Sequence, residues 1–260
     1  MKDKILLFIP AYNCENQLPR VLESLKGEAL SYIDTVLVIN NRSTDKTEEA
    51  ALIYKEENRD FPLKVLRNDE NYGLGGSHKV AFEYAIRKGY DYCIVLHGDD
   101  QGNFNDFIPM LKKGIYKKYD CVLGARFMFG SKLFGYSLFR TFGNIVYNFL
   151  FAMVTRRRIF DLGSGLNLYS TRMLENRFYQ KFPDNLTFNY CMVMALDYYG
   201  QKERFYPVTW KETDQVSNVK MGSQAVNVLK MLFKYMKNRE TIKTDYREKK
   251  IESYLAEEIR

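Results

Sequence analysis

Residues 91–101 of the chain read DYCIVLHGDDQ. The largely apolar run 91–96 is typical of a buried parallel strand, so Asp99 and Asp100 lie just past its carboxyl end. Ligands bind at this end of the strands in open α/β sheets. Neighbouring carboxylates repel each other unless a cation or a polar network offsets their charge, and a divalent cation against a substrate diphosphate is a common reason for such a pair. The stretch indicates a metal site or, because Gly-Asp-Asp-Gln-Gly-Asn is also good turn chemistry, a plain turn.

Strands and helices alternate around this stretch. Apolar runs at 5–9, 35–39 and 63–66 predict three more strands, and segments with apolar residues at helical spacing separate them. Such alternation is typical of a mostly parallel sheet with helices on both faces. The sequence therefore predicts an α/β fold.

The second half of the chain, from about residue 121, is less regular. Runs at 166–169 and 205–210 predict strands, and residues 222–237 predict an amphipathic helix. The tail after Lys237 has mixed charges and few apolar residues, so we expect a solvated helix or partial disorder there.

Residues 127–160 carry a dense set of aromatic side chains with basic residues between them, namely Lys132, Arg140 and the run 156–158. Aromatic and basic side chains together are typical of a surface at the interface of an anionic membrane. The same rings could equally form the core of the second half. Both alternatives stay open at this point.

Composition limits what kind of protein this is. The 260 residues suffice for one large domain, and 39 basic against 32 acidic residues give a net charge of +7, which favours an anionic partner. The first apolar run is too short for a signal peptide, and the run 145–154 is too short to span a bilayer. Four widely spaced cysteines indicate neither a disulfide framework nor metal ligands. We expect a cytoplasmic protein, soluble or touching the inner face of a membrane without crossing it.

Three motifs stand at strand ends in an order that one known family shows: IPAYN at 9–13, INNRSTDKT at 39–47 and GDDQ at 98–101. On these motifs the chain resembles the family 2 glycosyltransferases with the GT-A fold, strongly over residues 4–125 and more loosely to residue 220. Within that family it looks like the polyprenyl-phosphate branch, which includes enzymes similar to dolichyl-phosphate mannose synthase.

The resemblance implies a domain organisation and a reaction. A GT-A domain over 1–220 would comprise a nucleotide-sugar half, 1–125, and an acceptor half, 126–220, followed by an amphipathic helix and charged tail, 221–260. The enzyme would move a sugar, with inversion, from a nucleotide-diphospho-sugar (UDP- or GDP-sugar) to a polyprenyl-phosphate, lipid-linked or glycan acceptor. Cell-surface polysaccharide or glycolipid synthesis is the expected setting.

Donor binding is assigned by the resemblance to the first two motifs, the glycine-rich loop at 73–79 and the acidic loop at 97–101. The residues are Pro10, Ala11, Tyr12, Asn13, Asn40, Asn41, Gly75, Gly76, Lys79 and Asp99. The family usually has an acidic residue at position 40; an amide can both donate and accept, so base recognition remains possible there. Glycines allow close backbone approach, and a helix amino terminus favours anions. Lys79 would add a point charge to the diphosphate site.

The metal motif of the family aligns on Gln101. This alignment puts His97 at the first acidic position, Asp99 at the second and Asp100 at the spacer. Asp99 and His97 are therefore the expected ligands of Mg²⁺ or Mn²⁺, and the imidazole leans toward Mn²⁺. Catalytic roles are expected for Asp99, Asp100, Arg126 and Asp161.

The acceptor half carries further matches to the polyprenyl-phosphate branch. Gly124-Ala125-Arg126 and the loop 161–165 lie in the acceptor cleft of that branch, so Arg126 and Ser164 would contact the acceptor or its phosphate. Residues 210–220 resemble the closing segment of the family, in which Ser217 and Lys220 could also contact phosphate. Arg126 and the 161–165 loop could instead be an ordinary salt-bridged surface residue and a turn.

A hydroxyl acceptor needs a general base, which many relatives carry near positions 188–192. Here that stretch has no carboxylate, and Asp161, Asp184 and Asp214 are the nearest substitutes. A phosphate acceptor is already anionic, so the missing base favours a lipid phosphate. The alternative is a degenerate, non-catalytic module that binds nucleotide-sugar and regulates a partner, because Asn40, Asn41 and His97 replace usual acids. A nucleic-acid partner is not expected, since it would not explain the acidic strand ends.

Overall fold

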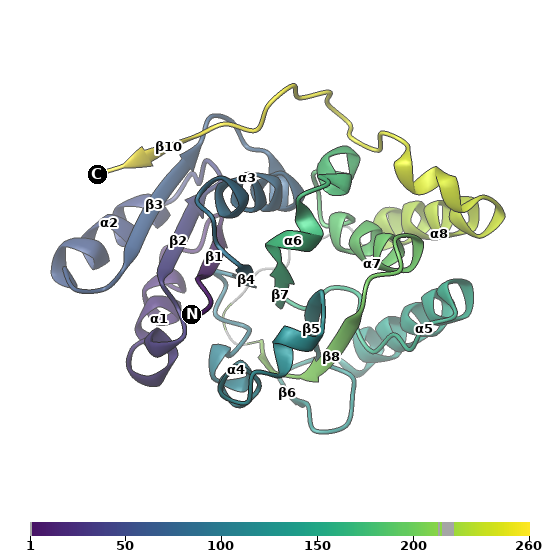
Figure 1. Cartoon of the computed structure of the whole chain (residues 1–260), viewed down its shortest axis with the longest axis horizontal. Helices are drawn as coiled ribbons and strands as arrows, with labels where there is room; N and C mark the ends of the chain where they lie inside the picture. The colour runs from purple at the N-terminus through teal and green to yellow at the C-terminus, as the bar shows by residue number, and fades with distance from the viewer. Residues whose placement is uncertain (1, 213, 215–220) are drawn as a thin grey trace.

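The computed structural model describes residues 2–212, 214 and 221–260. An eight-stranded sheet runs through the molecule in the order β10-β3-β2-β1-β4-β7-β5-β8 (Figure 1). Its strands are β1 (Ile5–Ala11), β2 (Thr35–Asn40), β3 (Leu63–Asn68), β4 (Tyr92–Leu96), β5 (Cys121–Ala125), β7 (Leu166–Ser170), β8 (Glu203–Pro207) and β10 (Ala256–Ile259). β7 is antiparallel to β4 and β5, and β10 is antiparallel to β3, whereas the other pairs are parallel. The predicted mostly parallel α/β sheet is confirmed.

Helices cover both faces of this sheet. They are α1 (Leu18–Ser24), α2 (Thr47–Glu57), α3 (Gly73–Arg87), α4 (Ile108–Lys112), α5 (Leu138–Thr155), α6 (Thr171–Leu174), α7 (Phe188–Tyr198) and α8 (Met221–Lys237). β1 shows why its sequence is apolar without interruption: Leu6 and Phe8 belong to the core under α3 and α7, whereas Leu7 and Ile9 belong to the core under α1, α2 and α4.

The molecule also has a small second sheet. It pairs β6 (Lys132–Phe134) with β9 (Thr209–Lys211). The single strand predicted at 205–210 is therefore wrong: the segment divides at Val208 into β8 of the large sheet and β9 of the small one. Trp210 of β9 also forms a bridge with Gly102, so β9 lies beside the acidic loop.

The tail after Lys237 is ordered, contrary to the prediction of a solvated helix or partial disorder. It crosses the top of the molecule in Figure 1 and ends in β10, where Ala256 lies opposite Asn68 and Ile259 opposite Val65. Tyr246 and Tyr254 pack against the core on the way. Without this strand β3 would be an open edge. The pairing of β10 depends on the distant strand β3. It leaves no periodic pattern in the sequence of the tail, so the sequence did not predict it.

Two amphipathic helices, α5 and α8, lie side by side at the opposite end of the sheet from α1 and α2 (Figure 1). The helix predicted at 222–237 is α8. In α5 the buried residues are Asn148, Phe151 and Thr155. Within the described part of the chain, no helix has the length and hydropathy required to cross a bilayer.

Candidate active site

The three strand-end motifs meet at the carboxyl edge of β1, β2 and β4. The amide of Gly98 donates to the carbonyl of Pro10 at 3.2 Å, and the amide of Asn41 donates to Ala11 at 2.9 Å. Asn13 joins the first motif to the second, since its side-chain oxygen accepts from the Thr44 amide at 2.8 Å. Motifs more than 80 residues apart in the chain thus share one hydrogen-bonded network, with Tyr12 exposed at its rim.

The two asparagines after β2 are held by the chain itself. The oxygen of Asn40 accepts from the Ser43 amide, and its nitrogen donates to Glu48 at 2.7 Å. The oxygen of Asn41 accepts from the Tyr72 amide and from the Asn68 side chain. Both side chains therefore shape the loops on which a nucleobase would rest, and their contact with a base stays a prediction.

The acidic loop brings His97 and Asp99 together in a partly buried setting. The Nδ1 of His97 lies 3.9 Å from an Asp99 carboxylate oxygen. Burial, and to a smaller extent the Arg126 charge, lowers the pKa of His97 to about 4. Burial raises the pKa of Asp99 to about 6, with the neighbouring Asp100 charge adding to the shift. Near neutral pH the site therefore holds a neutral imidazole and a carboxylate that is costly to keep ionised without a cation.

The His97–Asp99 pair is suited to hold a divalent metal, but two side chains do not make a complete site. Among the described residues, no cluster of three or more His, Cys, Asp or Glu side chains is placed to bind a metal. The Nε2 of His97 is nevertheless buried without a hydrogen-bond partner. The nitrogen near Asp99 is Nδ1, and Nε2 is the one without a partner. An imidazole and a carboxylate are each ligands that Mn²⁺ accepts, with the remaining ligands left to the substrate and water.

Arg126 and Asp161 form a buried ion pair next to this loop. The guanidinium donates to both carboxylate oxygens, Nε at 2.7 Å and Nη2 at 2.8 Å, and the Arg126 amide donates to the same carboxylate. The rings of Phe127, Tyr136 and Trp210 surround the guanidinium within 6 Å. The Gly165 carbonyl accepts from the His97 amide, so the 161–165 loop and the acidic loop are in direct contact.

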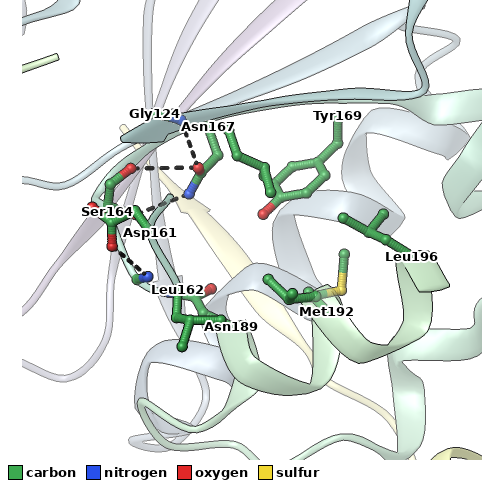
Figure 2. Close-up of a pocket in the computed structure, with 12 residues that line it drawn as sticks. Gly124, Asp161, Leu162, Ser164, Asn167, Tyr169, Asn189, Met192 and Leu196 are labelled. Atoms are coloured by element: carbon green, nitrogen blue, oxygen red, sulfur yellow. Dashed lines mark hydrogen bonds between the residues drawn. The ribbon is translucent and has the colours of Figure 1, made fainter. Parts of the chain in front are cut away.

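A small cavity lies beside the pair, between β5, β7 and α7 (Figure 2). Asn167 organises it, because its oxygen accepts from the Gly124 amide and its nitrogen donates to the Ser164 carbonyl. The side-chain oxygen of Asn189 is buried at the cavity without a partner. The space holds about one water molecule, which fits an internal water and excludes a sugar. The Ser164 hydroxyl is buried and bonds to the Leu166 carbonyl, so its contact with phosphate stays a prediction.

The glycine-rich loop approaches another part of the chain closely. The amides of Gly75 and Gly76 both donate to the Asp184 carbonyl, and a side chain at Gly75 would meet the Pro183 carbonyl at 2.4 Å. The amino terminus of α3 is thus capped by residues 183–184. The close approach that the glycines allow serves this packing, and their contact with a donor diphosphate stays a prediction.

Lys79, the expected point charge of the donor site, is fully buried. Its ammonium donates to the Asp184 carboxylate at 2.7 Å, the Phe182 carbonyl at 2.7 Å and the Tyr254 hydroxyl at 3.0 Å. Burial lowers the pKa of Lys79, and the Asp184 hydrogen bond opposes that shift. All three partners lie outside the strand-end motifs. Contact of Lys79 with the donor stays a prediction and would require this cluster to open.

Each carboxylate that the sequence offered as a general base is paired with a cation. Asp161 binds Arg126, Asp184 binds Lys79, and Asp214 binds Arg20 at 2.8 Å. A carboxylate held by a cation is a weaker proton acceptor. Asp214 lies within the closing segment, residues 210–220, and Ser217 and Lys220 of that segment lie outside the described residues.

Sequence reasoning missed Arg20, which bridges Asp100 and Asp214, and the contact of Trp210 with the acidic loop. An arginine on a polar helix face carries no signal of this kind. Trp210 stands at the start of the closing segment, and its packing follows only from the second sheet.

Comparison with known proteins agrees with this geometry. Residues 7–178 match the family model of Glycosyl transferase family 2, which is more than half of the chain. The chain belongs to this family. It is a glycosyltransferase, and the predicted family and enzyme class are confirmed.

Two relatives cover most of this family 2 chain. An uncharacterised protein of Methanocaldococcus jannaschii is 25% identical over 233 residues, which span 90% of this chain and 91% of that protein. The UDP-N-acetylglucosamine–dolichyl-phosphate N-acetylglucosaminyltransferase of Methanococcus voltae is 24% identical over 189 residues, spanning 67% and 73%. The resemblance to the polyprenyl-phosphate branch is thereby confirmed.

A solved structure confirms the GT-A fold. Glucosyl-3-phosphoglycerate synthase of Mycobacterium tuberculosis, crystallised with Mn²⁺, UDP-glucose and phosphoglyceric acid, matches with a TM-score of 0.66 over 90% of this chain and 80% of that one. The sequence identity is 15%, so this likeness concerns the fold alone.

Proposed function

We propose that this family 2 glycosyltransferase moves a sugar from a UDP- or GDP-sugar to a polyprenyl phosphate, with inversion, in the synthesis of a cell-surface polysaccharide or glycolipid. The choice of a phosphate acceptor rests on one observation: each candidate base is paired with a cation. The pairs are Asp161 with Arg126, Asp184 with Lys79 and Asp214 with Arg20. A polyprenol or sugar hydroxyl has to lose a proton as it attacks, whereas an ionised phosphate does not. The chemistry of the site therefore suits a phosphate acceptor.

The transfer step needs no proton acceptor. An oxygen of the acceptor phosphate attacks the anomeric carbon from the face opposite the leaving group and forms the new bond. The bond from that carbon to the diphosphate oxygen breaks, and its electron pair leaves with the nucleoside diphosphate. Inversion follows from this single displacement.

Arg126 is the residue that we assign to the acceptor phosphate. Asp161 holds its Nε and Nη2 and fixes the plane of the guanidinium, so the Nη1 edge is the one that would face the acceptor. The surrounding Phe127, Tyr136 and Trp210 rings keep the charge in a dry setting, where it attracts an anion more strongly than in water.

The donor diphosphate is assigned to the loop of His97 and Asp99. These two residues would hold Mg²⁺ or Mn²⁺, which when bound would neutralise charge on the leaving diphosphate. Tyr12, at the rim of the first motif, and the backbone around Asn40 and Asn41 would face the nucleoside. UDP-sugars come first among donors, because the Methanococcus voltae relative is named for UDP-N-acetylglucosamine.

We also propose that α5 and α8 rest on the membrane that holds the acceptor. Large apolar side chains on α5 are exposed, among them Leu138 at 87%, Phe139 at 79% and Phe142 at 68%. On α8, Phe233 and Met236 are each more than half exposed. Exposed lysines and arginines occur on or near these helices in the chain: Lys132 on β6, Arg156 and Arg158 just after α5, and Lys230, Lys234 and Lys237 on α8. Apolar side chains together with cations match an anionic lipid surface.

A transfer assay tests the proposal. The full chain, with Mn²⁺, is screened by thermal shift against UDP-, GDP-, CDP- and dTDP-sugars, and the stabilising donor is then incubated with undecaprenyl phosphate or undecaprenol. We expect a glycolipid product with undecaprenyl phosphate only, and NMR should show the anomer opposite to that of the donor. Equal transfer to undecaprenol would contradict the phosphate acceptor. Donor binding without transfer to any lipid or glycan acceptor would support the regulatory binding module instead.

A further inference from the structure

Arg20 ties the acidic loop to two other parts of the molecule. It projects from α1, and its Nε donates to an Asp100 carboxylate oxygen at 2.7 Å. Its Nη2 donates to Asp214 at 2.8 Å, and its Nη1 donates to the Asn16 carbonyl at 3.1 Å. All three guanidinium nitrogens are therefore engaged. They connect α1, the acidic loop after β4 and the segment that follows β9.

The backbone of Asp100 sets the direction of its side chain. Asp100 has a φ of +59°, a left-handed conformation that glycine adopts most readily and that aspartate tolerates better than most other residues. It lies between Asp99 and Gln101, and the Gln101 amide donates back to the Asp99 carboxylate at 3.2 Å. This turn sends the Asp100 carboxylate to Arg20 on α1, while Asp99 lies beside His97. One loop thus carries two neighbouring carboxylates with separate partners.

An ordinary surface ion pair is the simplest alternative, because the three side chains are 31% to 46% exposed and such pairs contribute little stability. Two observations favour a specific role. The guanidinium holds two carboxylates that are 114 positions apart in the chain, as their bonds to Arg20 span 80 and 194 residues. One of these carboxylates adjoins Asp99 in a turn with left-handed backbone.

We propose that Arg20 is a positioning residue for the donor site: through Asp100 it holds the 98–101 turn in the conformation that presents Asp99 beside His97, and through Asp214 it secures that turn to the acceptor half. The inference rests on the proposed donor function of Asp99 and adds a residue that no strand-end motif contains. Arg20 acts through Asp100 and is not assigned contact with the reacting atoms.

Mn²⁺ affinity separates positioning from simple electrostatics by its sign. Arg20→Gln removes a positive charge near a cation site, so electrostatics alone predicts tighter Mn²⁺ binding. If Arg20 positions the turn, Arg20→Gln should weaken Mn²⁺ binding at least threefold. Because Arg20 acts through Asp100, the same substitution should cause no further loss in a chain that already carries Asp100→Asn. Free Mn²⁺ is measured by electron paramagnetic resonance with the full chain, alone and with saturating UDP or GDP. The matched control is Lys26→Gln, which removes an equal charge from a residue paired with Glu23.

Tighter binding in Arg20→Gln, a loss below threefold, or an equal loss in Lys26→Gln would overturn the proposal. Asp100→Gly adds a second criterion: glycine accepts the left-handed turn but cannot bind Arg20. We expect it to weaken Mn²⁺ binding less than Asp100→Ala, which lacks both the ion pair and an easy left-handed backbone. The reverse order would contradict the role of the turn.

Amide exchange keeps the test independent of the metal. In the unliganded chain, Arg20→Gln should speed hydrogen exchange of the peptide covering 97–102 at least threefold, whereas Lys26→Gln should not. If the wild-type chain binds no Mn²⁺, the proposed metal site fails while this exchange still decides on Arg20. Unchanged exchange in Arg20→Gln would overturn the positioning role.

Discussion

The edge of the sheet at β1, β2 and β4 differs sharply from the outer face of α5 and α8. At the sheet edge, polar side chains such as Asn41, buried to 5% exposure, are bonded to one another. On α5, Phe139 is 79% exposed and Phe142 is 68% exposed, although both are apolar. Hydrogen bonds are directional, so polar groups held in this way can position a small ligand. Apolar contacts are not directional, so an apolar face can rest on an extended surface without a fixed orientation. Under the proposed function, the sheet edge would bind the nucleotide-sugar and the face of α5 and α8 would meet the membrane that holds the acceptor.

Asp99→Ala, at the sheet edge, should cause the largest loss of activity. The substitution removes the carboxylate expected to hold the metal against the diphosphate, so we expect sugar transfer to fall by about 10²–10³-fold or more. Product formation with excess Mn²⁺ and undecaprenyl phosphate provides the measurement. Asp60→Ala, at an exposed loop position, is the control and should keep full activity. Retained metal-dependent transfer in Asp99→Ala would remove Asp99 from the site.

The double substitution Phe139→Glu and Phe142→Glu on α5 should weaken binding to membranes. Burial of an aromatic side chain contributes about 1.5–3 kcal/mol, and an added negative charge is repelled by anionic lipid, so vesicle binding should fall at least roughly tenfold. Cosedimentation with vesicles of phosphatidylcholine and phosphatidylglycerol measures it. Ile53→Glu replaces an apolar residue of α2 that is 47% exposed and should leave binding unchanged. Equal loss in both variants would contradict a docking face on α5.

The pH dependence of metal binding tests the assignment of Asp99 as a metal ligand. The pKa of Asp99 is about 6, and a proton competes with the metal for the same carboxylate. Mn²⁺ affinity should therefore be flat above about pH 7 and fall by about tenfold per unit below pH 6. His97, with a pKa of about 4, stays neutral over most of this range and adds no slope above pH 5. Isothermal titration calorimetry from pH 5 to 8 measures the profile; a flat profile would count against Asp99 as ligand.

Tyr254→Phe should have the smallest effect and should concern stability. It removes a hydroxyl that bonds to both Lys79 and Asp184, so we expect a loss of about 1–2 kcal/mol and a decrease in Tm of about 2–8 °C. Thermal unfolding followed by circular dichroism measures it. Tyr12→Phe, which removes an exposed hydroxyl, is the control. An unchanged Tm would mean that the tail contributes nothing to the Lys79 cluster.

Prediction from sequence succeeded where the signal was local. The parallel strands and the meeting of the three motifs follow from apolar runs and turn residues that are visible in short windows. Prediction failed for the tail and for the strand at 205–210, because pairing with β3 and the change of sheet at Val208 depend on distant partners. For residues 127–160 the structure separates the rings along α5: Phe151 is core, whereas Phe139 and Phe142 are exposed, and their contact with a membrane stays a prediction.

The sequence by itself determined the α/β alternation, the family and the position of Asp99 at a strand end, since hydrophobic period and turn chemistry are properties of neighbouring residues. Only the tertiary structure decided which charges pair. Lys79 meets Asp184 across 105 positions and Arg20 meets Asp214 across 194. A charged side chain has many possible partners in sequence, and the packing of the sheet and its helices selects one.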